Sequence, residues 1–288
     1  MLIYDKNEVI SENSQVKKVI IAVDFKSYSE NIANFALNFL RGLPAEITLF
    51  HSLQSKFTKE EAEQKMTDFL INLKASKYCK AYFSFKTIIY NANAASSIEI
   101  LNNRHHNGLV IMGSNNNPDS KILGKIAKDI LFETKSNFLI IPPQAEVRLL
   151  HNVGILAENS LESLPFMNVF RRYLRCQDVF VNLVLFKEYG EIDSNDVFLI
   201  KNYQNFFSEN FVFPTIYESI DLLEVMCQNI PNSNLDFFGI CWDENTKVFQ
   251  ALLEHDFQMV PSFLKIPMFI SKEKQILETK KVLEEVLA

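Results

Sequence analysis

The sequence predicts an α/β fold made of two doubly wound parallel-sheet repeats in tandem. Three observations predict it. Short apolar runs rich in β-branched residues alternate with amphipathic helical stretches, the whole order restarts near residue 153, and 288 residues suffice for two domains. Strands that alternate with helices form parallel sheets with right-handed crossovers. We therefore expect one repeat over residues 1–145 and a second over residues 146–288.

The five strands of the first repeat are expected where apolar runs lack polar alternation, as in a sheet covered on both faces. They are residues 19–23, 46–53, 82–90, 109–112 and 138–141. Helices are expected where apolar residues recur three and four positions apart, at residues 29–40, 59–77, 96–103 and 120–134. In the helix over 96–103 we expect Ile98, Ile100 and Leu101 to face inward.

The second repeat begins with Val153 to Ala157 and Glu158, which match the first strand and Asp24 at an offset of 134 residues. Its further strands are expected at 179–186, 211–217, 235–242 and 268–270, and helices at 219–228 and 272–287. Residues 144–152 form a short linker.

Composition narrows the classes of function. Residues 1–145 carry 17 Lys and Arg against 14 Asp and Glu, a net of +3, whereas residues 146–288 carry 12 against 21, a net of −9. An acidic half argues against nucleic acid as the main partner. No apolar run is long enough to span a bilayer and the N-terminus lacks a signal-peptide pattern, so we expect a cytoplasmic protein.

The cysteines are widely spaced, without the paired spacing of zinc or thioredoxin sites, and we expect them to be buried as small hydrophobes. They are Cys79, Cys176, Cys227 and Cys241.

Four segments in the right order resemble the universal stress protein family. They are VIIAVDF at 19–25, ITLFHSL at 47–53, GLVIMGS at 108–114 and SNFLIIPP at 136–143. The resemblance covers nearly the whole chain and implies the adenine nucleotide alpha-hydrolase-like fold in its tandem form. It also implies that ATP or AMP is the ligand to consider, without a metal.

In nucleotide-binding members of that family the loop after the fourth strand reads glycine, two residues, glycine, nine residues, glycine, then serine or threonine. Here Gly113 matches the first position and Asn116 replaces the second glycine. Gly124 takes the third place only with two residues deleted, and Lys125 replaces the hydroxyl residue. Glycines let backbone amides approach phosphate oxygens, and asparagine is the substitute that best tolerates left-handed backbone. With Lys121 and Lys128, Lys125 adds positive charge, so the loop suits a phosphate or another polar ligand.

The resemblance assigns further contacts to the base end of the nucleotide. Asp24 matches the family aspartate there, with Phe25 beside it, and Ser52 holds a position that contacts the base. Met112 and Ser114 flank Gly113 and complete the expected site. Structural roles compete with these assignments, because Asp24 could cap the first helix, Gly124 could allow close helix packing, and the lysines could be a solvated helix face. We expect His51 to be a packed strand residue.

In the second repeat the fourth strand leads into Asp243 and Glu244, whose charge would repel phosphate, so we expect this repeat not to bind nucleotide. Its many aromatic residues are expected to be core.

The preferred function is a stress-response module that binds nucleotide in the first repeat and signals without catalysis. The alternative is an interaction or scaffold protein that binds no nucleotide. An enzyme ranks last, since no triad, metal cluster or water-positioning carboxylate is visible. An unknown protein partner is expected. The last strands, 138–143 and 267–271, could pair within one chain as a pseudo-dimer, and further homodimerisation is plausible.

Overall fold

The computed structural model describes eleven segments of the chain. They are residues 16–53, 57–105, 108–114, 125–134, 136–157, 164–175, 177–187, 192–208, 210–218, 233–242 and 266–272. The expected helix over 219–228, the expected helix residues after Lys272 and the loop over 115–124 lie outside them.

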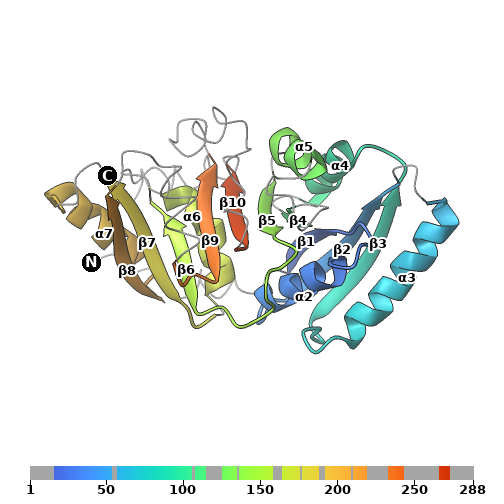
Figure 1. The fold of residues 1–288 in the computed structure, drawn as a ribbon, viewed down its shortest axis with the longest axis horizontal. Coiled ribbons are helices and arrows are strands. Elements are labelled where there is room, and N and C mark those ends of the chain that lie inside the picture. Colours follow the sequence, from blue (N-terminus) through green and yellow to red (C-terminus); the bar gives the residue numbers. More distant parts are fainter. Residues whose placement is uncertain are drawn as a thin grey trace.

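The described strands form one ten-stranded sheet in the order β3-β2-β1-β4-β5-β10-β9-β6-β7-β8 (Figure 1). The elements of its first half are β1 (Lys17–Ala22), α2 (Ser29–Phe39), β2 (Ala45–Ser52), α3 (Lys59–Ala75), β3 (Phe83–Tyr90), α4 (Ala94–His105), β4 (Leu109–Gly113), α5 (Lys125–Glu133) and β5 (Asn137–Ile141). All pairings among these five strands are parallel. The strand order reverses at β1, between β2 and β4, and a ligand site is expected outside the carboxyl ends of strands at such a reversal.

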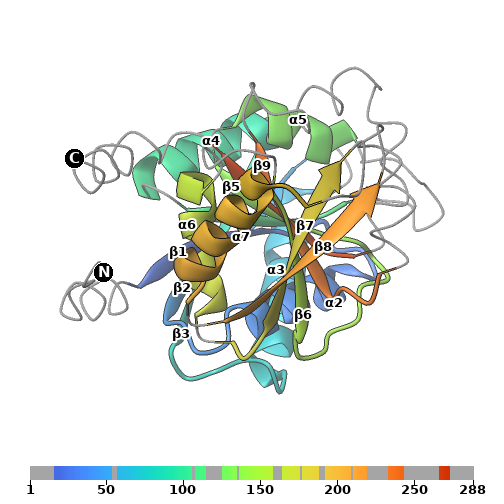
Figure 2. The ribbon, with the colours of Figure 1, turned by 90° about the vertical axis from the view of Figure 1, so that its left-hand side faces the viewer.

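The second half repeats the strand order of the first. Its elements are β6 (Asn152–Leu156), α6 (Leu164–Leu174), β7 (Phe180–Lys187), α7 (Ser194–Phe206), β8 (Phe211–Glu218), β9 (Phe237–Trp242) and β10 (Met268–Lys272). Figure 2 looks toward the edge strand β8 and shows α7 beside it. The prediction that a helix begins at Lys272 is wrong, because Lys272 pairs with Trp242 as the last residue of β10.

The helices α6 and α7 were not predicted from the sequence. A signal for α7 is present in the sequence, since Asp193 and Asp196 stand three residues apart ahead of an apolar run. The Asp193 carboxylate accepts from the amides of Asn195 and Asp196, and the Asp196 side chain accepts from the Asp193 amide. This reciprocal capping box fixes the start of the helix.

The predicted pairing of the two last strands is confirmed. β5 and β10 pair antiparallel, with Leu139 opposite Phe269 at the centre and Ile140 opposite Met268. The pairing joins two five-stranded halves into one sheet and covers two edges that would otherwise expose unpaired backbone groups.

The core lies on both faces of the sheet, and on each face its hydrophobic cluster includes residues of both halves. On one face α2, α3, α6 and α7 contribute to the cluster, and on the other face α4 and α5 do. Phe39 of α2 stacks on Tyr173 of α6 at 5.3 Å and on Phe237 of β9 at 5.2 Å between ring centroids. The Gln177 side chain also donates to the Phe39 carbonyl at 2.8 Å. The halves therefore share packed aromatic surface as well as a strand pair.

The segment between the halves is fixed by side chains from both. Asn38 of α2 donates to the Arg148 carbonyl at 2.6 Å, and the Tyr78 hydroxyl donates to the Val147 carbonyl at 3.0 Å. The Arg148 guanidinium contacts the buried Asp236 carboxylate at 2.6 Å. These contacts argue against free hinge motion between the halves.

One inward-facing residue of α4 was predicted wrongly. Ile98 and Leu101 are buried, but Ile100 is 50% exposed. Residues three apart share a helix face, whereas a residue two positions away points to the opposite side.

Candidate functional site

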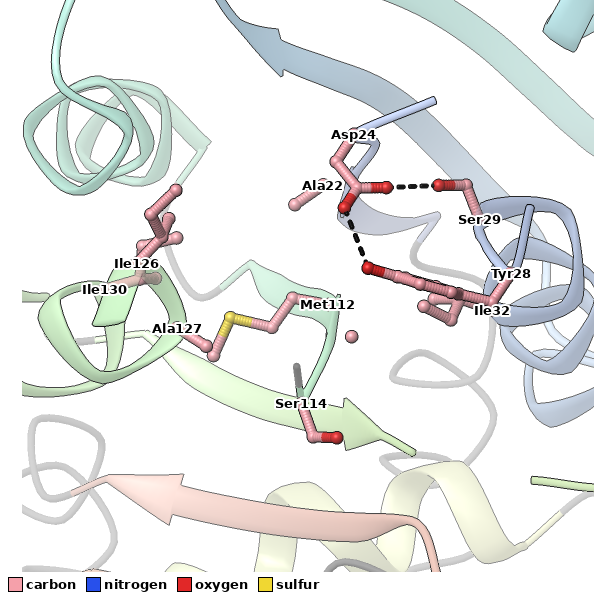
Figure 3. A pocket seen from close by; sticks show the side chains of 11 residues that line it. Ala22, Asp24, Tyr28, Ser29, Ile32, Met112, Ser114, Ile126, Ala127 and Ile130 are labelled. Atoms are coloured by element: carbon pink, nitrogen blue, oxygen red, sulfur yellow. Dashed lines mark hydrogen bonds between the residues drawn. The ribbon is translucent and has the colours of Figure 1, made fainter. Parts of the chain in front are cut away.

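Two adjoining cavities lie at the carboxyl ends of the central strands of the first half. The cavity between β1 and β4 has about 120 Å³ and is lined by Asp24, Tyr28, Ile32, Gly113 and Ser114 among others (Figure 3). The cavity between β1 and β2 has about 170 Å³ and is lined by Phe50, His51, Ser52 and Phe57 among others. Ala22, Asp24, Ile126 and Ile130 line both cavities. The strand reversal thus brings Asp24, Ser52, Met112, Gly113 and Ser114 to one place.

Both carboxylate oxygens of Asp24 have hydrogen-bond partners within the protein. Oδ1 accepts from the Ser29 hydroxyl at 2.5 Å and from the Lys26 amide at 3.2 Å. Oδ2 accepts from the Tyr28 hydroxyl at 3.2 Å, and Lys26 Nζ lies 3.9 Å away. The residue in the N-cap position of α2 is Tyr28, so Asp24 organises the turn before α2 without being its N-cap.

The residue after Asp24 has an unusual backbone conformation. Phe25 has φ of 57°, which is uncommon for a bulky side chain. Its ring packs on His51 at 4.4 Å and lies 6.1 Å from Phe57 between centroids. Phe25 is not among the residues that line either cavity, so the structure places it beside the candidate site.

His51 is a packed strand residue, as predicted. It is 7% exposed, and its Nδ1 donates to the Val23 carbonyl at 2.7 Å. This hydrogen bond links the ends of β1 and β2 and holds the floor of the larger cavity.

Ser52 lines the larger cavity, and its hydroxyl already has a partner. It donates to the Ala92 carbonyl at 2.6 Å. The Ser52 hydroxyl could therefore donate a hydrogen bond to a ligand only if its bond to Ala92 breaks. Its oxygen can still accept a hydrogen bond from a ligand.

Gly113 has a structural reason to be glycine that the sequence did not reveal. A methyl group on its Cα would lie 2.7 Å from Ile32 Cδ1, and its φ is not in the positive range. The close contact between α2 and β4 therefore favours a small residue at this position, since a larger one would displace the end of the Ile32 side chain.

The neighbours of Gly113 are buried, with Met112 3% and Ser114 2% exposed. The Ser114 amide donates to the Ile141 carbonyl at 3.0 Å, so it is not free to bind a phosphate. Asn116, Lys121 and Gly124 lie outside the described residues. Lys125 begins α5, and Lys128 is half-buried on that helix.

The corresponding strand ends of the second half carry larger or fully buried side chains. The registers align Ala22 with Leu156 and Gly113 with Cys241. Leu156 is 2% and Cys241 4% exposed. Glu158, Asp243 and Glu244 lie outside the described residues.

Other groups do not extend the site. Among the described residues, no cluster of three or more His, Cys, Asp or Glu side chains is arranged to hold a metal ion. Cys241 is buried as predicted, but Cys79 is only half-buried, and the other two cysteines are not described. Within the described segments, none of the helices has the length and apolar character needed to cross a bilayer.

Comparisons with known proteins give a fold. No protein-family model and no curated protein matches the sequence. A universal stress protein from Archaeoglobus fulgidus superposes with a TM-score of 0.60 at 13% identity, over 90% of this chain and 97% of that one. A putative universal stress protein from Pseudomonas aeruginosa gives 0.61 at 10% identity, over 93% and 97%. The cytoplasmic domain of a prokaryotic cation chloride cotransporter gives 0.56 at 9% identity, over 91% and 97%.

Proposed function

We propose that this chain, which has the fold of the universal stress proteins, binds an adenine nucleotide in residues 1–145 and signals through conformation without catalysis. In this proposal residues 146–288 bind no nucleotide and serve as an interaction surface for a protein partner in the cytoplasm.

The observation that carries the proposal is the convergence of strand-end residues on two adjoining cavities. The larger cavity has apolar walls from Phe50, Ala94 and Ile126, which suit a planar base. The smaller one opens beside Gly113, at the end of β4 where the predicted phosphate loop begins. Asp24 lines both and would meet the part of a ligand that joins base to phosphate.

A role without catalysis is supported by the side chains around these cavities. Asp24 is the single carboxylate among their described lining residues, and its oxygens already accept from Ser29 and Tyr28. His51 uses Nδ1 to hold Val23. A binding module needs no further acid or base, whereas a hydrolase needs a group that positions water.

Native mass spectrometry for co-purified nucleotide and calorimetric titration with ATP and AMP test the proposal. We expect binding to the wild type and its loss in Asp24→Ala. The exposed Asp68→Ala on α3 is the matched control and should bind normally. Gly113→Val is unsuitable, because its side chain would collide with Ile32. Absence of heat at millimolar ATP would refute nucleotide binding.

The second candidate function is an interaction module without nucleotide. It is favoured by two groups that the protein satisfies internally, the Asp24 carboxylate and the Ser114 amide. This candidate predicts no bound nucleotide and no change in melting temperature with ATP, because only a ligand that binds the folded state stabilises it.

A further inference from the structure

Tyr28 spans the smaller cavity from one strand end to the next. Its hydroxyl donates to Asp24 Oδ2 at 3.2 Å, at the end of β1. Its ring carbon Cε2 lies 3.9 Å from the position that a methyl group on Gly113 would take, at the end of β4. Figure 3 shows the Tyr28 side chain directed toward Asp24, with the hydrogen bond between them drawn as a dashed line. The side chain therefore lies between the two strand ends, on the wall of the smaller cavity.

The two hydrogen bonds that Asp24 accepts from hydroxyl groups differ in strength. The Ser29 hydroxyl lies 2.5 Å from Oδ1, whereas the Tyr28 hydroxyl lies 3.2 Å from Oδ2. Short hydrogen bonds to a carboxylate are the stronger ones, so the contact from Tyr28 is the easier of the two to break. Breaking it would leave Asp24 held by Ser29 and the Lys26 amide, with Lys26 Nζ 3.9 Å from Oδ2, and Oδ2 could then accept from a new donor.

The rest of the turn is anchored independently of Tyr28. Phe25 keeps its φ of 57° while its ring packs on His51, and the Lys26 amide donates to Asp24. A residue with positive φ persists only where its surroundings hold it there. Rotation of the Tyr28 side chain can therefore open the cavity without unfolding the turn.

We propose that Tyr28 is a gate, whose hydroxyl occupies Asp24 in the empty protein and is displaced by the hydroxyl or amino donor of a nucleoside. This inference rests on the proposed function and adds to it how the ligand enters. Burial and the neighbouring Asp24 raise the pKa of Tyr28, so its hydroxyl remains a proton donor throughout the neutral range. A ligand with a donor replaces that hydrogen bond, whereas inorganic phosphate without a nucleoside does not.

The gate predicts a specific kinetic effect. If only the open form binds, the apparent affinity is reduced by the fraction of molecules that are open. Tyr28→Phe keeps the ring and removes the hydrogen bond to the carboxylate, which shifts the equilibrium toward the open form by roughly tenfold. We expect the association rate constant for ATP to rise by about that factor, with an unchanged dissociation rate constant.

The test is surface plasmon resonance of ATP over immobilised wild type, Tyr28→Phe and Tyr78→Phe. The Tyr78→Phe control removes a hydroxyl that donates to the Val147 carbonyl, away from both cavities, and should bind as the wild type does. Inorganic phosphate is injected as the probe that lacks a nucleoside, and no gain is expected for it. Thermal melting of each variant confirms that it is folded.

The possible outcomes separate the two proposals. ATP binding to the wild type that is unchanged or weaker in Tyr28→Phe, or a gain confined to the dissociation rate, would overturn the gate and leave nucleotide binding intact. Binding that is seen only in Tyr28→Phe would support a gate that is closed almost fully. Absence of ATP binding in all three proteins would refute both the gate and the proposed function.

Discussion

Lys272, the last residue of β10, donates from Nζ to the carbonyl of Thr134 at 2.8 Å, just beyond α5. It also donates to the Leu131 carbonyl, and its ammonium lies over the Phe138 ring. A side chain of the second half thus donates hydrogen bonds to backbone carbonyls at the end of α5. This helix follows the predicted phosphate loop of the first half. Positive charge at a helix C-terminus is favourable.

Burial of Lys272 predicts a pH dependence of stability. Burial lowers the pKa of Lys272 from 10.5 to about 8, against an opposing effect of Glu99. Between about pH 8 and 10.5 the unfolded chain binds more protons at this site than the folded chain, so the contribution of Lys272 to stability rises with pH. The increase in the free energy of unfolding over this pH range has an upper limit of about 3 kcal/mol.

Urea unfolding of wild type and Lys272→Met at pH 7.5 and pH 9.5 measures that contribution. We expect the stability of the wild type relative to the variant to be greater at pH 9.5. Lys201→Met, which changes an exposed lysine on α7, should show a constant difference. A difference for Lys272→Met that stays the same or shrinks at high pH would contradict the assignment.

The contact between Gly113 and Ile32 predicts a compensated pair of substitutions. Gly113→Ala would place its methyl group 2.7 Å from Ile32 Cδ1, the end of a flexible side chain that lines the smaller cavity. We therefore expect a cost at the low end of the range for overpacking, about 1 kcal/mol. Ile32→Val removes that Cδ1 and should restore part of the loss in the double variant. Urea unfolding of both single variants and the double variant gives the coupling free energy, and additive effects would show that the two side chains do not collide.

The packing of Phe39 leads us to expect that the two halves unfold together. Its ring stacks on Tyr173 and Phe237 and is fully buried, so Phe39→Ala should cost about 3–5 kcal/mol. We also expect one calorimetric unfolding transition for the wild type and two for this variant. Phe198→Ala, which removes a ring that is 60% exposed, should change stability by less than about 0.5 kcal/mol. A single transition in Phe39→Ala would show that the remaining contacts between the halves, among them the β5–β10 pair, are enough to couple them.

On the outer strands of the second half, we predict that two exposed phenylalanines can be replaced by an ion pair. Phe180, Phe211 and Phe213 are 46%, 69% and 50% exposed. The registers align Phe180 with Glu46 and Phe213 with Lys86, which form an ion pair at 2.9 Å in the first half. Phe180→Glu with Phe213→Lys should therefore fold with stability close to that of the wild type. Urea unfolding checks this, and a loss above about 2 kcal/mol would show that the rings have a packing role.

Much of the fold could be predicted because its signals are local. Apolar runs such as Val19 to Ala22 and spacings such as Ile98 and Leu101 identify an element from a few neighbouring residues. The helices α6 and α7 were missed, and the structure shows that the start of α7 rests on the Asp193 and Asp196 capping box. Ile100 was misplaced because helical phase, and not only apolar character, decides which side chain is buried.

The candidate site could be predicted only in its position. The ends of β1, β2 and β4 follow from the apolar runs, and the resemblance to the universal stress proteins implied that Asp24, Ser52 and Gly113 belong to one site. The partners of these residues were not, since Tyr28 and Ser29 reach Asp24 from α2 and the Ser114 amide is used by Ile141 of another strand.

The sequence by itself determined the order of strands and helices, the tandem repeat and the edge of the sheet at which polar residues gather, because periodicity along the chain encodes all three. Only the tertiary structure decided that Gly113 packs closely against Ile32, that the Tyr28 hydroxyl donates to Asp24 and that Lys272 of one half donates to a carbonyl just beyond α5 of the other. These contacts depend on distances of a few ångströms between separately folded elements, and side-chain packing fixes such distances where spacing in the sequence does not.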